Sequence, residues 1–172
     1  QYVNESDTLL VQVGITNNAG HNLPSGVTFS RQLWLEITAT SAGNILYKSG
    51  HLNENKDLFD FYIDPSNQVD PDLTIFNTVL YNAAGDSGLR NVSVERMAYM
   101  SDYTIPTSGS KIVTYEIPVP ENTSDTINIS ARLRFRALPP FYLRELVPGA
   151  DESKLTIFDL DSVSIKIPII QN

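Results

Sequence analysis

The sequence predicts an all-β fold, a single antiparallel Ig-like β-sandwich with one short helix near residues 140–147. Three observations support this fold class. Apolar residues recur at every second position in six or more short runs, turn-forming residues separate the runs, and no segment carries a sustained helical stripe. At 172 residues the chain is predicted to form one domain, residues 1–172, with a core large enough to be stable without disulfide bonds.

The first predicted strands lie in the N-terminal third of the chain. Residues 9–16 alternate apolar and polar positions and end at the turn-rich segment that begins with Asn17. A second strand is expected from Val27 to Thr40. The turn at residues 41–44 joins it to a short run at residues 45–47, and this arrangement predicts a hairpin.

Four further strands are expected at Thr74–Tyr81, Lys111–Val119, Ile127–Ala137 and Ser162–Ile170. A short helix is predicted at Pro140–Val147, because two prolines open this segment and a Pro-Gly pair closes it. Two polar stretches do not follow the strand pattern. They are predicted to be long loops: an acidic insertion at about residues 53–72, and the segment Ala83–Glu95.

Composition excludes several classes of function. A formal charge of −8 gives no field that would neutralise phosphates, so no nucleic-acid partner is expected. No apolar run approaches the length of a transmembrane segment. The absence of cysteine excludes disulfides, thiolate metal sites, cysteine nucleophiles and thioether-attached haem in these residues. The beginning at Gln1, without an initiator methionine or a signal peptide, is expected of a mature or trimmed product.

The chain is not expected to be an enzyme. Its two histidines, His21 and His51, have no recognisable nucleophile elbow nearby, and they could supply at most half of the ligands of a zinc site. Carboxylates are plentiful, but an acidic chain always offers pairs of them.

The acidic insertion is a candidate calcium site. Its hard oxygen ligands would be Asp60, Asp64, Asn67, Asp70 and Asp72. Their spacing does not follow the EF-hand pattern, and a solvated acidic loop without metal is the alternative.

The predicted strand at residues 127–137 places three of the seven arginines, Arg132, Arg134 and Arg136, on one face. Such an arginine ladder could bind an anion or dock a partner. The alternative is cross-strand pairing with carboxylates such as Glu36 or Glu116, which requires no function.

His21 lies in a turn-rich loop between two predicted strands. Gly20 and Gly26 permit unusual backbone angles, and Pro24 stiffens the middle of the loop. A histidine in so constrained a loop could be held for metal or haem ligation, or it could structure the loop through hydrogen bonds to the backbone.

Together these segments resemble the cysteine-free β-sandwich region toward the C-terminus of bacterial multihaem c-type cytochromes. The resemblance spans roughly residues 8–145 and rests on ordered blocks. The blocks are residues 13–17 followed by Gly20-His21-x-x-Pro24-Ser25-Gly26, RQLWLEIT at Arg31–Thr38, Tyr47–Gly50, Asp102–Pro106, and ARLRFRALPP at Ala131–Pro140. Ser25 stands where the family usually has threonine, and the Cys-x-x-Cys-His motifs of covalent haem are missing.

The resemblance implies an exported protein, periplasmic or at the cell surface, and a haem-free accessory or docking module for a multihaem cytochrome or for other subunits of a surface assembly. No haem would be bound covalently. His21 would be a candidate ligand to the haem of a partner, and the arginine ladder could meet haem propionates or an acidic partner face. Whether the chain is a region of a larger cytochrome or a separate subunit stays open.

A carbohydrate-binding or cell-surface adhesion sandwich is the alternative function. Eight tyrosines, seven phenylalanines and one tryptophan could supply a sugar-stacking platform, and the acidic insertion could hold stabilising calcium.

Overall fold

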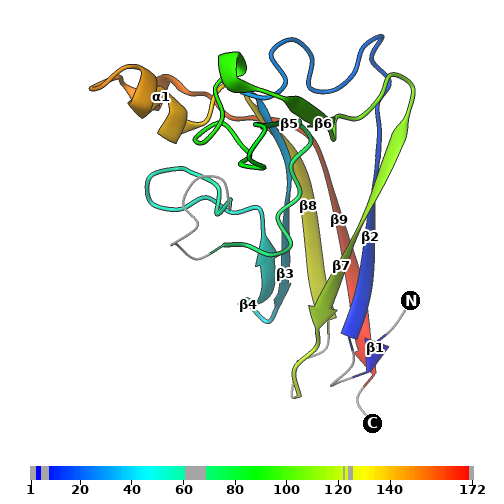
Figure 1. Ribbon diagram of the computed structural model, residues 1–172. Coiled ribbons are helices and arrows are strands. Elements are labelled where there is room, and N and C mark those ends of the chain that lie inside the picture. Colours follow the sequence, from blue (N-terminus) through cyan, green and yellow to red (C-terminus); the bar gives the residue numbers. More distant parts are fainter. Residues whose placement is uncertain (1–2, 5–7, 61–68, 122, 124–125, 171–172) are drawn as a thin grey trace.

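A five-stranded sheet forms the centre of the molecule (Figure 1). The computed structural model describes residues 3–4, 8–60, 69–121, 123 and 126–170. The strand order of this sheet is β1-β9-β8-β3-β4, and β1 alone pairs in parallel. Its strands are β1 (Val3–Asn4), β3 (Gln32–Ser41), β4 (Asn44–Ser49), β8 (Thr126–Arg136) and β9 (Phe158–Ile170). The predicted β3–β4 hairpin is confirmed, with Ala42 and Gly43 both at positive φ in its two-residue turn.

A two-stranded antiparallel sheet, β2 (Thr8–Thr16) with β7 (Ser110–Pro118), packs on one face of the five-stranded sheet (Figure 1). The alternation predicted from sequence explains the packing, since every second residue of β2, β3, β7 and β8 points into the space between the sheets. The main core lies there, and Leu33, Ile37, Ile117 and Ile127 are fully buried in it. The all-β class with a short helix is thus confirmed.

Loops and the helix cover the opposite face of the large sheet. There Trp34, Leu58 and Phe141 form a second buried cluster. Helix α1 (Pro140–Leu146) lies where it was predicted, and Figure 1 shows it on the side away from β2 and β7. Because layers lie on both sides of it, β3 is buried along most of its length on both faces.

The start of α1 depends on a residue far away in the sequence. Asp57, 2% exposed, accepts a hydrogen bond of 2.9 Å from the backbone N–H of Phe141 and a second bond from the Arg144 guanidinium. The first N–H groups of a helix have no partner within the helix, so this carboxylate does the work of a capping side chain. Asp57 thereby fixes the helix to the acidic insertion.

Several predicted boundaries were wrong. Residues 27–31 do not continue β3, because Gly26 and Val27 begin tight turns there, with Thr28 N–H bonded to Gly26 and Ser30 N–H to Val27. The strand predicted at Thr74–Tyr81 is shorter, because β5 begins only at Thr78. Before it, Ile75 forms an isolated bridge with Trp34 of β3. Strand β9 begins at Phe158 rather than Ser162, and a bulge opposite Leu133 and Arg134 interrupts its pairing with β8.

One hairpin strand was missed. β5 (Thr78–Tyr81) pairs with β6 (Tyr99–Asp102), a four-residue strand without clear alternation. Two single-turn 3₁₀ helices, η1 (Val94–Arg96) and η2 (Glu152–Lys154), were not predicted either. No helix among the described residues is long and apolar enough to cross a membrane.

Candidate functional site

The arginine ladder lies on the outer face of β8, as predicted. In the strand register with β3, Arg132 lies opposite Glu36. In the register with β9, Arg134 lies opposite Asp159. Glu36, whose side chain is 5% exposed, accepts hydrogen bonds from both guanidiniums, including one of 3.1 Å from Nε of Arg132. Asp159 accepts from Nε of Arg134 at 2.8 Å. Two carboxylates therefore balance two guanidiniums on this face, and the hydrogen bond to Glu36 raises the pKa of Arg132.

Arg136 occupies a different environment from its two neighbours. It is 1% exposed and donates to Oε1 of Gln32 and to the carbonyl of Lys56. Burial lowers its pKa to about 10, in spite of the nearby Asp57 carboxylate, but the guanidinium stays charged at neutral pH. Arg136 is a buried structural cation.

Trp34 lies beneath the ladder. The guanidinium carbons of Arg134 and Arg136 lie 5.7 and 5.3 Å from the centroid of its ring. These distances suit cation–π attraction. The structure therefore contains the cross-strand pairing with Glu36 that the sequence offered as the alternative to docking. Glu116 lies on β7, away from this face, and pairs with Leu10. Anion binding or docking by the ladder stays a prediction.

The His21 loop is fixed by a buried asparagine. Nδ2 of Asn17, a residue with no exposed surface, donates to the carbonyls of His21 (2.8 Å) and Ile105 (3.0 Å). Two backbone hydrogen bonds between Leu23 and Ile105 add to this attachment. The loop at residues 17–24 is therefore bound to the segment at residues 104–107. Two blocks of the predicted resemblance, far apart in sequence, lie together here.

The side chain of His21 is exposed, while its backbone is fixed. Its Nδ1 lies 2.9 Å from the carbonyl oxygen of Asn22. Because a carbonyl only accepts, the neutral ring carries its proton on Nδ1, and this assignment leaves the lone pair on Nε2. The loop thus fixes the backbone of His21, and the exposed ring keeps an unprotonated nitrogen, Nε2.

The acidic insertion is attached to the end of β4. Oδ2 of Asp70 accepts from the Ser49 hydroxyl at 2.9 Å and from the Gly50 N–H at 2.8 Å. Asp72 accepts from the Tyr47 hydroxyl at 2.7 Å. These carboxylates bind the protein's own donors.

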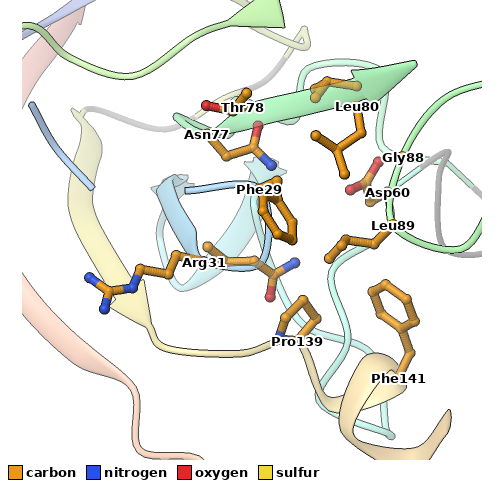
Figure 2. A pocket seen from close by; sticks show the side chains of 12 residues that line it. Phe29, Arg31, Asp60, Asn77, Thr78, Leu80, Gly88, Leu89, Pro139 and Phe141 are labelled. Atoms are coloured by element: carbon orange, nitrogen blue, oxygen red, sulfur yellow. The ribbon is translucent and has the colours of Figure 1, made fainter. Parts of the chain in front are cut away.

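Of the other three candidate calcium ligands, one belongs to the described residues. Asp60 lies near the small cleft of Figure 2, whereas Asp64 and Asn67 lie outside the described residues. Within the described part of the chain, no three carboxylate or histidine side chains gather in a way that could hold a metal ion. The calcium site stays a prediction.

Figure 2 shows a narrow cleft between β5, the start of β3 and the start of α1. Its volume is about 30 Å³, far below the roughly 300–1,000 Å³ of ligand-binding pockets. Phe29, Leu89 and Phe141 are among its lining side chains, and the Arg31 guanidinium points away from them to bond the Ser25 carbonyl. The cleft is too small for an organic substrate.

Aromatic residues are partly exposed at the β5–β6 hairpin. The rings of Tyr81 and Tyr99 stack with centroids 4.7 Å apart and an interplanar angle of 3°, and Tyr99 is 54% exposed. The carbohydrate-binding alternative rests on such rings and stays a prediction.

The Tyr47–Asp72 contact leads to a prediction about alkaline stability. Burial, with the hydrogen bond to Asp72, raises the pKa of Tyr47, and burial also raises the pKa of the neighbouring Tyr115. An unfolded chain loses tyrosine protons from about pH 10, while the folded chain keeps them, so the free energy of unfolding should fall as the pH rises above 10. Tyr47→Phe should make this fall shallower.

At pH 7 the same substitution should cost about 1 kcal/mol, the value of the lost hydrogen bond. Urea titrations from pH 7 to 11 measure both effects, and Tyr103→Phe, at an exposed ring, is the matched control. An unchanged alkaline slope in Tyr47→Phe would contradict the prediction.

Comparison with known proteins gives one informative likeness. No family model matches the chain, and no match is found among curated proteins. The fold is similar to the crystal structure of a penta-haem cytochrome c552 from Thermochromatium tepidum, with a TM-score of 0.66 and 19% sequence identity. The match covers 97% of this chain and 38% of that chain, so this chain spans well under half of the cytochrome's length. At this identity the likeness shows a shared fold.

Proposed function

We propose that the chain is a haem-free β-sandwich module that associates with a multihaem c-type cytochrome, in a structural or docking role. The observation that carries the proposal is the fold likeness to a penta-haem cytochrome over nearly the whole of this chain. The absence of cysteine adds that these residues cannot attach a c-type haem covalently. The role is non-enzymatic, and its setting is outside the cytoplasm, in the periplasm or at the cell surface, close to electron-transfer proteins.

His21 is the residue that we propose to meet the partner. Its exposed ring, its fixed backbone and its free Nε2 fit an axial ligand supplied to a haem iron of another polypeptide. The arginine ladder is less available, because Glu36 and Asp159 already balance Arg132 and Arg134. We therefore propose the contact at the loop rather than on the outer face of β8.

The association can be tested by mixing the purified chain with multihaem c-type cytochromes of its source organism. We expect a complex in size-exclusion chromatography and calorimetry that weakens as salt rises, since exposed charges are screened within about 10 Å at 0.1 M salt. No association with any of them at low ionic strength would overturn the proposal. Reading the gene on both sides of this segment separates a region of a larger cytochrome from a separate subunit.

The His21 contact has its own readout. On complex formation the cytochrome's optical and electron paramagnetic resonance spectra should change as a nitrogen ligand joins the iron. His21→Gln should abolish that change and weaken the complex about tenfold or more, since even outer-shell changes at metal sites cost this much.

The matched control is His51→Gln, at the second histidine, whose Nε2 contacts the Thr38 hydroxyl at 3.0 Å. A complex that forms without any spectral change would keep the association and refute the ligand role of His21.

A further inference from the structure

The two sheets of the sandwich differ in width, and part of the large sheet is left uncovered. β2 and β7 cover the inner faces of β3 and β8 and the C-terminal end of β9, where Ile167 is buried in the main core, but they leave residues 160–165 of β9 open. On β9, Val163 is 56%, Ile165 45% and Leu160 49% exposed. A groove of about 570 Å³ runs between these residues and β2. Among the described residues, no strand beside β2 covers this part of β9.

The wall of the groove formed by β2 is an open strand edge. β2 pairs with β7 along all nine of its residues without a bulge, and within the described residues it has no sheet partner on its other side. Every second residue of β2 thus directs its backbone N–H and C=O groups toward the groove.

This edge lacks the features that normally protect an edge strand. Proteins block such edges with charged residues, prolines or bulges. The sequence of β2, TLLVQVGIT, contains no charged residue and no proline. Two other edges of the sandwich are protected: β4 carries Lys48 and lies beside a bulge in its pairing with β3, and β7 carries Lys111 and Glu116. The bare edge of β2 suits a strand that pairs with it.

The groove contains one charge. Among the described residues that line it, Asp161 is the only ionisable one. Its carboxylate is exposed and accepts from the neighbouring Ser162 N–H, and it forms no ion pair within the described part of the chain. A single carboxylate in an otherwise uncharged groove is complementary to a single cationic side chain on the occupant.

We propose that this groove binds an extended strand of another polypeptide. The strand pairs with the free edge of β2, lays alternate apolar side chains on Val163 and Ile165, and sets a lysine or arginine against Asp161. Recognition of this kind takes affinity from backbone hydrogen bonds and specificity from alternate side chains. The proposal goes beyond the cytochrome association, because any polypeptide with such a segment would bind.

A second copy of this chain fits the groove poorly. Each copy carries a formal charge of −8, so two copies repel. Pairing of β2 with β2 would also bring no cation to Asp161, because β2 has none. The charge balance therefore favours a different polypeptide with a basic residue.

The probes are nine-residue peptides, capped at both ends, with valine at alternate positions and threonine between them. In each peptide of the set, lysine replaces one valine in turn. We expect one lysine register to bind best in fluorescence anisotropy. N-methylation of the amides along one edge of that peptide should abolish binding, because it removes the donors to β2.

Two substitutions in β9 locate the contact. Val163→Gln should weaken binding about tenfold, the equivalent of removing one buried aliphatic side chain. Ser164→Gln, the next residue and on the opposite face, is the matched control and should leave binding unchanged. Asp161→Lys should favour the peptide with glutamate in place of lysine, so that the charge reversal restores binding.

Three outcomes would overturn the proposal. One is the absence of binding by every peptide up to about 1 mM, a very weak affinity. Another is equal weakening by Val163→Gln and Ser164→Gln. The third is a dimer of the chain in sedimentation that Val163→Gln dissociates and Ser164→Gln does not, since a second copy would then fill the groove.

Discussion

Gly50→Ala is expected to lower the free energy of unfolding by about 3 kcal/mol or more, among the largest effects of any single substitution in this chain. Gly50 has a φ of +73°, and a Cβ atom there would lie 2.0 Å from the backbone oxygen of Leu35. The backbone cannot shift freely, since the Gly50 N–H bonds to Asp70 and its carbonyl accepts from Nε1 of Trp34 at 3.0 Å. Backbone strain and a steric clash therefore combine.

Two other glycines separate these two contributions. Gly43 has a φ of +83° with open space around its Cβ position, so Gly43→Ala should cost only about 1–2 kcal/mol from the left-handed conformation. Gly20→Ala meets neither restriction and should be nearly neutral. Urea denaturation followed by circular dichroism measures all three. Equal losses for Gly50→Ala and Gly43→Ala would show that the Leu35 carbonyl is not an obstacle.

Glu36→Gln is expected to cost about 2 kcal/mol at pH 7. Glu36 is buried and accepts from both Arg132 and Arg134, so its loss leaves two guanidiniums to share Asp159. Breaking a fully buried ion pair costs about 3–5 kcal/mol. The expected loss is smaller here because the Arg132 side chain is 43% exposed and regains water.

Asp159→Asn is the control for Glu36→Gln. Its carboxylate binds the same two arginines but is 41% exposed, so the cost should stay below about 1 kcal/mol and fall with added salt. The loss in Glu36→Gln should depend less on salt. If both variants lost the same stability in urea titrations, burial of Glu36 would not be the source of the effect.

Much of the fold follows from local pattern. Period-two alternation predicted β2, β7 and β8, and prolines and a Pro-Gly pair predicted α1, because these signals act within a few residues. β6 gave no such signal, since Tyr99–Asp102 has only four residues and most of them are exposed. Pairing with β5 makes this segment a strand. Residues 27–31 look like strand in composition, yet hydrogen bonds of the turn after Gly26 determine their structure.

For the candidate site, too, the sequence predicted the local pattern and not the long-range contacts. The sequence predicted that three arginines share one face, and it offered Glu36 as a partner, but strand register alone decided that choice. The pairing of Asp57 with Phe141 joins residues 84 positions apart, and no local pattern reports it. Likewise Asn17 holds the His21 loop through a contact with Ile105, 88 positions away. Long-range partners of polar groups are what the sequence does not show.

Trp34 gives this molecule an optical property of its own. It is the one tryptophan of the chain, it has no exposed surface, and it lies under two guanidiniums on the outer side of the large sheet. Its ultraviolet emission therefore arises from a single known place. Haem absorbs light at the wavelengths that tryptophan emits, so a haem brought close by a bound cytochrome would accept this energy and dim the signal. If a cytochrome binds the chain, the loss of this emission would measure the distance between Trp34 and the cytochrome's haem.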